Sequence, residues 1–469
     1  MMDLIDRGLE LTKKYAPSQA EVFGSRNKVT TIRLATSEIV ESKTVTVQGV
    51  GIRLVHDKSI GFASTTDIST NGIEEAIEKA NHAAKAKKAD PDFVTLPEPR
   101  KNGHFVAADN ELLALDLEKA VDYGRIALET AKSLGKDLDI SGSINFVSEE
   151  SFIRNSLGVD GKDVATFVYS SITAEKGEDL STVGQDCART LKDLKPEKAT
   201  KEAVDLSRKS TGGKDIQPGK YDVILSPYAF TELAEYVLAY AVDASAVDAN
   251  LSYFTGRLGQ DVSADLLTLT DDGRHPTGIA SKTIDDEGVP TGTTPIIRKG
   301  VLQNFLSDTY YAYKLSSSLR TLSPTGNAFR FGSVPGRDPF ILPQIQATNL
   351  VTSPGDHSVD ELIAETRRGL LIGRIWYTYP INPTIGEFST TNRGSTFLIE
   401  NGRILHPILP NSFRINDNIQ ALLKNIAALS KETVQSVVWG GASASISPYV
   451  KIKDVNITYS KGEQLVKGT

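Results

Sequence analysis

The sequence predicts an α+β protein, with an N-terminal mixed helix and sheet region followed by a strand-rich C-terminal domain that carries inserted helices. Helical and strand-like segments do not alternate regularly along the chain, which argues against a doubly wound parallel sheet. The 469 residues exceed what one ordinary hydrophobic core organises, so two or three domains are expected. With 39% hydrophobic and 24% charged residues, the composition is that of a globular protein.

An N-terminal α+β domain is predicted over residues 1–105. Its first 16 residues combine scattered charges with apolar positions at helical spacing, which is typical of an amphipathic helix rather than a cleavable signal. Thr70 and Asn71 can cap a later helix whose apolar stripe ends at Ala84. Between these helices, four segments rich in Val, Ile and Thr predict a meander of strands: AEVFGSRN, KVTTIRLAT, KTVTVQGVGIRLVHD and SIGFASTT.

A middle α+β segment, residues 106–218, is expected to pack with the first domain. It begins with a helix over residues 117–134 that Gly135 ends. The polar, Gly- and Lys-rich stretch STGGKDIQPGK places the main domain boundary near Pro218. This stretch does not match a phosphate-binding loop, because its glycine spacing is wrong and Tyr221 replaces the required hydroxyl residue. Strands are expected at LDISGSINFVS, SFIRNSLG and VATFVYSSITAEK.

The C-terminal domain is predicted over residues 219–469. Lys299-Gly300 and Asn401-Gly402 each separate two apolar runs, which predicts a β-hairpin at each pair. Helices are expected at 308–319 and 418–429, within otherwise strand-rich sequence.

The stretch TELAEYVLAYAVDA, residues 231–244, predicts the helix with the most chemical interest. Glu232, Glu235 and Tyr236 lie outside its apolar stripe. Two carboxylates one turn apart can flank a metal ion or a scissile bond, but on a helix they more often belong to a solvated face, and the residues alone favour that interpretation. The stripe itself follows the spacing of an α-helix: Phe230, Leu233, Ala234, Val237, Leu238 and Ala241.

Several function classes are disfavoured by composition and spacing. The net charge of -7 argues against nucleic-acid binding, and no apolar run is long enough to span a membrane. No two of the six histidines lie within five residues of each other, so no paired-histidine zinc motif is present. The single cysteine, Cys187, excludes an internal disulfide and indicates a reducing cytoplasm. The acidic groups Asp271-Asp272 and Asp285-Asp286-Glu287 lie in loop-like sequence and are interpreted as turn residues in preference to ligands of a hard cation such as magnesium or calcium.

Longer segments carry a resemblance to a known family. SYFTGRLGQDVSADLLTLTDDG, ASKTIDDEGVPTGTTPIIRKGVLQNFLSDTYYAYKL and SPTGNAFR resemble the C-terminal domain of the TldD/PmbA family, and AEVFGSRN, GVGIRLVHDKSIGFASTTDIS and IEEAIEKANHAAKAKK are similar to its first domain. In that family, TldD-type subunits carry a His-Glu-x-x-x-His helix that holds a catalytic zinc together with a C-terminal cysteine. They pair with PmbA-type subunits, also called TldE, which lack the motif. The pair is a metallopeptidase acting on unfolded proteins or small peptides.

The resemblance implies that this chain is of the PmbA/TldE type. Thr231 and Tyr236 stand where the two histidines of the motif would be, and Glu232 stands at its general base. A shift of the register by about one turn supplies no histidine, and SVVWGGASASISP, which resembles the cysteine-bearing stretch, contains no cysteine. The chain is therefore expected to hold no catalytic residue, metal ligand or cofactor, with zinc in the partner subunit.

The same resemblance makes Asp285, Asp286, Glu287 and Tyr310 candidates for lining a shared substrate cleft, against the alternative that they are turn residues and a core aromatic. The expected function is that of the non-metal subunit of a heteromeric metallopeptidase, which completes the substrate cleft and stabilises a zinc-bearing TldD-type partner. The alternative is a homodimeric peptide-binding or regulatory protein without catalytic activity. Any modulation of DNA gyrase, which older names in the family imply, is expected to be indirect.

Overall fold

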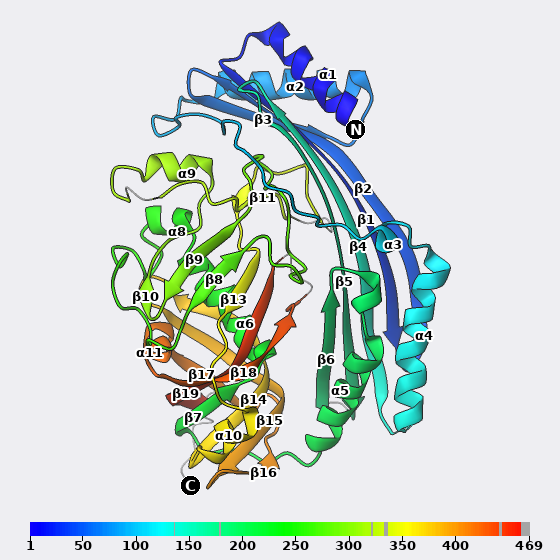
Figure 1. The fold of residues 1–469 in the computed structure, drawn as a ribbon, viewed down its shortest axis with the longest axis vertical. Coiled ribbons are helices and arrows are strands. Elements are labelled where there is room, and N and C mark those ends of the chain that lie inside the picture. The colour runs from blue at the N-terminus through cyan, green and yellow to red at the C-terminus, as the bar shows by residue number, and fades with distance from the viewer. Residues whose placement is uncertain (136, 178–179, 320–321, 333–335, 440–442, 461–469) are drawn as a thin grey trace, which may run out of the picture.

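The computed structural model describes residues 1–135, 137–177, 180–319, 322–332, 336–439 and 443–460. Two large β-sheets and their helices confirm the predicted α+β class. Figure 1 shows the N-terminal sheet as a long curved layer that arches over the strand-rich C-terminal half.

The N-terminal sheet has six strands in the order β3-β2-β1-β4-β5-β6, and every neighbouring pair is antiparallel. AEVFGSRN and KVTTIRLAT, expected as separate strands, form the single strand β1, because β1 is paired along its length with β2 on one side and β4 on the other. LDISGSINFVS and SFIRNSLG likewise join in β4. The strands are β1 (Gln19–Ala35), β2 (Glu38–His56), β3 (Ser59–Thr65), β4 (Asp139–Asn155), β5 (Asp160–Lys176) and β6 (Leu180–Ala188).

Two pairs of helices cover this sheet and form two separate hydrophobic cores. The helices α1 and α2 pack near one end of the sheet, and α4 and α5 pack near the other (Figure 1). The helix predicted over 117–134 is confirmed, and Gly135 ends it. Ser69, rather than Thr70 or Asn71, caps α2 by accepting a hydrogen bond from the Gly72 amide. These helices are α1 (Met2–Thr12), α2 (Thr70–Ala86), α3 (Asn110–Leu113), α4 (Leu117–Leu134) and α5 (Pro196–Lys209), with short 3₁₀ turns η1 (Lys13–Tyr15) and η2 (Leu191–Asp193).

The C-terminal half, from β7 to β19, is built on an 11-stranded mixed sheet, and the N-terminal half runs from α1 to α5. Both predicted hairpins are confirmed: β9 and β10 join at Lys299-Gly300, and β15 and β16 join at Asn401-Gly402, with positive φ at all four residues. The strands are β7 (Gly219–Leu225), β8 (Leu269–Asp272), β9 (Thr293–Arg298), β10 (Val301–Leu302), β13 (Asn349–Thr352), β14 (Arg368–Asn382), β15 (Glu387–Glu400), β16 (Arg403–Pro407), β17 (Phe413–Asn418), β18 (Ile426–Ser436) and β19 (Ala444–Tyr459). A separate pair consists of β11 (Ala328–Phe329) and β12 (Gln344–Ile345).

Short helices are inserted among these strands, as predicted, although two are shorter than expected. The helix predicted at 308–319 is regular only over α9 (Thr309–Lys314), and the one predicted at 418–429 stops at α11 (Ile419–Lys424), because Ile426 begins β18 and pairs with β19. The remaining helices are α6 (Pro227–Leu233), the π-helical segment η3 (Ala234–Leu238), α7 (Ala239–Ala241), α8 (Ala244–Asp248) and α10 (Val359–Ala364). None of the helices in the described ranges combines the length and the apolar character that a membrane crossing requires.

Candidate functional site

The helix of residues 231–244 starts earlier than its sequence pattern suggests and lies inside the C-terminal half. Ser226 caps it by accepting a hydrogen bond from the Ala229 amide at 3.2 Å, and Pro227 occupies the first turn, where a missing N–H costs nothing. The predicted apolar stripe is buried from Phe230 to Ala241. Contacts with β14, β18 and β19 surround α6, so more than one face of the helix is covered.

The backbone widens into the π-helical segment η3 directly after Leu233. Such segments occur mostly as single turns at functional positions. Thr231 is 0% exposed, and its Oγ1 donates a hydrogen bond to the Pro227 carbonyl at 2.7 Å. Tyr236, five residues later, is 40% exposed. The two motif positions therefore do not present a pair of ligands to a common point.

Glu232 is the buried carboxylate of this helix, with 1% of its surface exposed, so the solvated-face interpretation is wrong for it. Its Oε2 accepts a hydrogen bond from Nε1 of Trp439 at 3.0 Å. Burial raises the pKa of Glu232 to about 7, while hydrogen bonds with Thr378 and Trp439 and the charge of Arg374 oppose the rise. Both protonation states of Glu232 are thus accessible near neutral pH.

Glu235 lies one turn beyond Glu232 and is also withdrawn from water. Burial raises its pKa well above the ordinary value, the charge of Glu232 adds to the rise, and a hydrogen bond with Ser443 opposes it. Within the described part of the chain, its Oε1 has no hydrogen-bond partner. Burial and the charge of Glu232 therefore both favour the protonated form of Glu235.

An arginine and exposed aromatic rings surround this pair of acids. The guanidinium of Arg374 lies 5.9 Å from the ring centroid of Tyr228 and 5.7 Å from that of Trp439. Trp439 has φ of 55° and Tyr377 has φ of 50°, a left-handed backbone that bulky residues rarely adopt and that is often found at functional sites. Trp439 is 54% exposed and Tyr377 64% exposed. We call Tyr236, Tyr377 and Trp439, which lie on segments that meet at Glu232, the aromatic rim.

These residues fit a catalytic zinc ion poorly. The hydroxyl of Thr231 is already engaged, Glu232 accepts from Trp439, and the positive charge of Arg374 next to Glu232 disfavours a second cation. Nowhere among the described residues do three or more His, Cys, Asp or Glu side chains form a group that could hold a metal ion. The arrangement can instead hold a proton on its carboxylates and present aromatic rings at the surface.

A cavity of about 110 Å³ lies next to this site, between β6 of the N-terminal sheet and the C-terminal half. Tyr228 and Arg374 line one side, and Gln185 lines the other. The Gln185 side chain makes two hydrogen bonds to the backbone of Val437. Its Nε2 donates to the Val437 carbonyl at 2.6 Å, and its Oε1 accepts from the Val437 amide at 3.2 Å. Arg374 and Gln185 cannot be identified as site residues from the sequence, because neither belongs to a recognisable local pattern.

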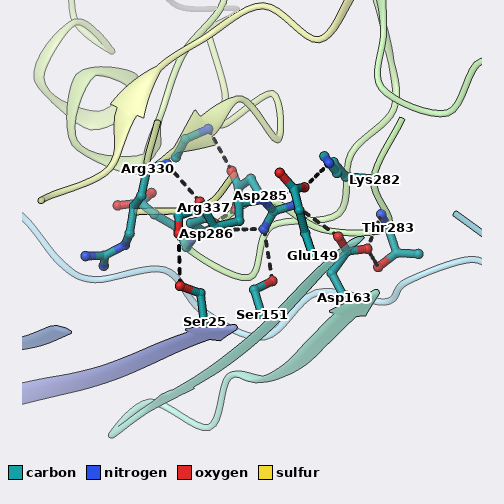
Figure 2. Close-up of polar contacts among 12 residues, drawn as sticks. Ser25, Glu149, Ser151, Asp163, Lys282, Thr283, Asp285, Asp286, Arg330 and Arg337 are labelled. Atoms are coloured by element: carbon teal, nitrogen blue, oxygen red, sulfur yellow. Dashed lines mark hydrogen bonds and ion pairs between the residues drawn. The ribbon is translucent and has the colours of Figure 1, made fainter. Parts of the chain in front are cut away.

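The acidic stretch 285–287 lies elsewhere, in the interface between the two halves (Figure 2). Asp286 is 0% exposed and pairs with Arg337, which also bonds to Ser151 at 2.9 Å and to Asp163 at 3.0 Å. Lys282 pairs with Glu149 of β4. These partners alternate along β4 and β5, on the face of the N-terminal sheet that meets the C-terminal half.

Asp285 and Glu287 are buried on either side of Asp286. Asp285 accepts from the amides of Glu287 at 3.0 Å, Val289 at 2.8 Å and Ala328 at 3.1 Å, so it fixes a local turn. Glu287 accepts from Arg53 at 3.2 Å, and Arg53 also pairs with Glu21.

Tyr310, the fourth cleft candidate, lies at the start of α9. Its hydroxyl donates to Asp90 at 2.9 Å, and burial raises its pKa above the ordinary value. Glu287 and Tyr310 line one small cavity, whereas Asp285 and Asp286 are 1% and 0% exposed and bind groups of the chain itself. The four candidates are thus neighbours, but they lie apart from the helix that carries Glu232.

Comparisons with known proteins match most of the chain. Family models described as PmbA/TldA metallopeptidase domain 1, central domain and C-terminal domain match residues 20–84, 110–211 and 218–459. The chain is 27% identical over 386 residues to an uncharacterised protein of Methanocaldococcus jannaschii, covering 81% of this chain and 84% of that protein. It is 25% identical over 406 residues to the metalloprotease PmbA of Escherichia coli O157:H7, covering 82% and 81%.

A solved structure shares the fold. The crystal structure of TldE from Thermococcus kodakarensis superimposes with a TM-score of 0.86 at 24% identity, and the match covers 97% of this chain and 100% of that one. Because the C-terminal family model alone spans more than half of the sequence, and the other two models match in the expected order, the chain belongs to the PmbA/TldD metallopeptidase family.

Proposed function

We propose that this chain is the non-metal subunit of a heteromeric TldD/PmbA-type metallopeptidase. In this role it completes the substrate cleft and stabilises a zinc-bearing TldD-type partner, which hydrolyses unfolded proteins or small peptides. Relatives named as TldD homologues and as PmbA exist alongside a structural neighbour named TldE, which is compatible with such pairing. With one cysteine in 469 residues, the pair is expected to work in a reducing cytoplasm.

The observation that carries the proposal is the state of Glu232. A general base in a metallopeptidase takes its proton from a metal-bound water, whereas Glu232 accepts a hydrogen bond from Trp439 and has Arg374 as its neighbouring charge. Neither Thr231 nor Tyr236 supplies a zinc ligand of the usual kind. In this proposal the helix has a structural role, and hydrolysis takes place in the partner subunit.

The aromatic rim supports the partner role. Exposed rings of Tyr and Trp are enriched at the energetic centres of protein interfaces. Here Tyr236, Tyr377 and Trp439 are 40%, 64% and 54% exposed, and burying them against a partner would remove apolar surface from water. A partner docked on the rim would cover the surface around Trp439, whose indole is bonded to Glu232.

Metal content and cleavage of unfolded casein test the proposal, for this chain alone and for its mixture with a zinc-motif paralogue. We expect no stoichiometric zinc and no cleavage by the chain alone, and chelator-sensitive cleavage by the mixture. Stoichiometric zinc with cleavage by the chain alone would refute the proposal. A stable homodimer that binds casein but never combines with the paralogue would establish the alternative, a peptide-binding or regulatory protein.

The docking surface is tested separately with Trp439→Ala. Hot-spot aromatics contribute at least about 2 kcal/mol to binding, so we expect roughly a thirtyfold or greater loss of affinity for the paralogue. Tyr313→Ala, which removes a 38% exposed ring on α9, is the matched control and should leave the affinity unchanged. Equal affinities for the two variants would place the interface elsewhere.

A further inference from the structure

A second cavity, of about 170 Å³, lies at the junction of the two halves, away from the helix that carries Glu232. It is lined by β2, β3, the segment that follows α2, the start of α9 and the loops at Glu287 and Leu342. Figure 1 shows α9 at the end of the C-terminal half nearest α1 and α2. Apolar side chains form much of its wall, and three charged residues, Arg53, Glu287 and Asp308, line it together with Tyr310. The residues that matter are Arg53, Phe93, Leu96, Asp308, Tyr310 and Leu342.

Asp308 is a buried carboxylate with unused bonding capacity. It caps α9, with Oδ1 accepting from the Tyr311 amide at 2.8 Å, and the residue is only 7% exposed. Its Oδ2 receives no hydrogen bond from any described residue. Arg53, 8% exposed, lines the same cavity, and its Nε also lacks a hydrogen-bond partner within the described ranges. Buried polar atoms are nearly always paired, so the unpaired Nε of Arg53, together with the unused Oδ2 of Asp308, points to a polar partner in this cavity.

The charges around the cavity leave Asp308 without a counterion. Glu21 accepts from both Arg53 and Arg330, and Glu287 accepts from Arg53 and from the Thr309 amide at 3.0 Å. Both arginines thus pair with carboxylates other than Asp308, and within the described ranges Asp308 has no ion-pair partner of its own. Burial and the charge of Glu287 raise the pKa of Asp308 to about 7; Arg53 opposes the rise, and Asp243 adds to it.

We propose that this cavity binds a small ligand that carries a primary ammonium group on an apolar body about the size of an amino-acid side chain. The ammonium would donate to Oδ2 of Asp308 and supply the missing positive charge. Phe93 and Leu96, both buried, and Leu342 at 38% exposure would enclose the apolar body. A volume of about 170 Å³ suits such a body, since an apolar cavity of about 150 Å³ accommodates benzene.

Three ligand sources share this chemistry: a free amine, a free amino acid and the first residue of a peptide. Isothermal titration calorimetry of the full chain with isoamylamine, leucine amide and leucine distinguishes them. Binding of isoamylamine alone assigns a free amine, and binding of leucine amide but not leucine assigns a peptide N-terminus. Leucine binding at least as tight as that of its amide assigns a free amino acid, whose carboxylate would pair with Arg53. Saturable binding of any one supports the site, and no saturable binding of all three overturns it.

The charge argument is tested with a neutral isostere and a matched pair of variants. Isoamyl alcohol should bind the native chain at least about tenfold more weakly than isoamylamine, because it cannot form the charge-assisted bond. Asp308→Asn preserves the helix cap, since Asn caps as well as Asp, and should lower amine affinity by about tenfold or more. Asp116→Asn makes the same change at the cap of α4 and should have no effect. Equal affinity of alcohol and amine, or an unchanged affinity in Asp308→Asn, would overturn the proposal.

Discussion

Replacing Arg337 by methionine tests whether the buried charges at the interface join the two halves of the molecule. Arg337 is 0% exposed, and its guanidinium lies among Asp286, Asp163 and Glu149, with a further hydrogen bond to Ser151. Methionine approximates the length of the side chain, so the main effect is the loss of the charge. Removing one partner of a buried ion pair typically costs about 3–5 kcal/mol, because the other charge stays buried without compensation.

One feature of the site places the expected loss at the upper part of this range. Three carboxylates, rather than one, lose their shared cation, although Lys282 remains paired with Glu149. The partners also come from both halves, so we expect the halves to unfold in separate transitions in the variant. Denaturant unfolding followed by tryptophan fluorescence, which reports on the C-terminal half, and by circular dichroism, which reports on both halves, measures the two effects.

The control and the pH dependence make this prediction refutable. Arg125→Met removes an exposed pair with Asp122, whose side chains are 61% and 57% exposed, and should cost no more than about 1 kcal/mol. Burial raises the pKa of Asp286, and Arg337 opposes that rise. Without Arg337 the folded-state pKa rises further above the unfolded value, so the deficit should shrink as pH falls from about 8 to about 5. A loss for Arg337→Met within about 1 kcal/mol of the control would refute the reasoning.

Three further outcomes follow from individual sites. Gly51→Ala would place its Cβ 2.5 Å from the Pro339 carbonyl oxygen and should destabilise the fold by about 1–3 kcal/mol. The control Gly292→Ala, whose Cβ would meet no atom within 4 Å, should change the stability by no more than about 0.5 kcal/mol. Equal thermal melts of the two variants would contradict the close approach at Gly51. Amine affinity at the second cavity should rise between about pH 6 and pH 8 as Asp308 ionises, and calorimetry on Asp308→Asn should show no such rise. Burial raises the pKa of Cys187 to about 12, and the thiolate is the reactive form. A disulfide reagent should therefore modify the native chain over a hundredfold more slowly than the unfolded chain. Comparable rates would contradict the raised pKa.

Elements set by local chemistry were predictable from the sequence. Lys299-Gly300 and Asn401-Gly402 form the predicted turns because glycine accepts the positive φ that a tight hairpin requires. The helix over 117–134 has its limits in the sequence as well, with Asp116 as the cap and Gly135 as the end. By contrast, the breaks assumed within β1 and β4 do not exist, because pairing on both sides overrides the weak turn preference of their Gly, Ser and Asn residues.

Contacts between distant residues could not be predicted. Glu232 and Trp439 are 207 residues apart, and Arg337 and Asp163 are 174 apart. Periodicity assigns one face of a helix to the core, but α6 is enclosed by three strands, so a residue off the stripe, Glu232, is buried too. The acidic stretch 285–287 carries a local turn signal, and only the fold reveals its pairing with arginines of the interface.

The two sites are physically connected through the end of the helix that carries Glu232. Leu306 donates to the Val242 carbonyl at 2.8 Å and accepts from the Ala244 amide at 3.0 Å, and Asp308 follows two residues later. Leu306 and Glu235 also line one cavity of about 200 Å³. An ammonium ligand that fixes Asp308 therefore acts on a segment hydrogen-bonded to this helix, and it can shift the helix only if it binds one arrangement more tightly.

Trp439 provides the measurement of this connection, because its indole is bonded to Glu232. The chain has two tryptophans, so in a Trp376→Phe variant the fluorescence comes from Trp439 alone. If the sites are coupled, isoamylamine should change that emission with the same dissociation constant that calorimetry gives, and Asp308→Asn should abolish the change. Saturable binding with unaltered emission would mean that the hydrogen bonds at Leu306 hold the helix in one arrangement, and that the two sites act independently.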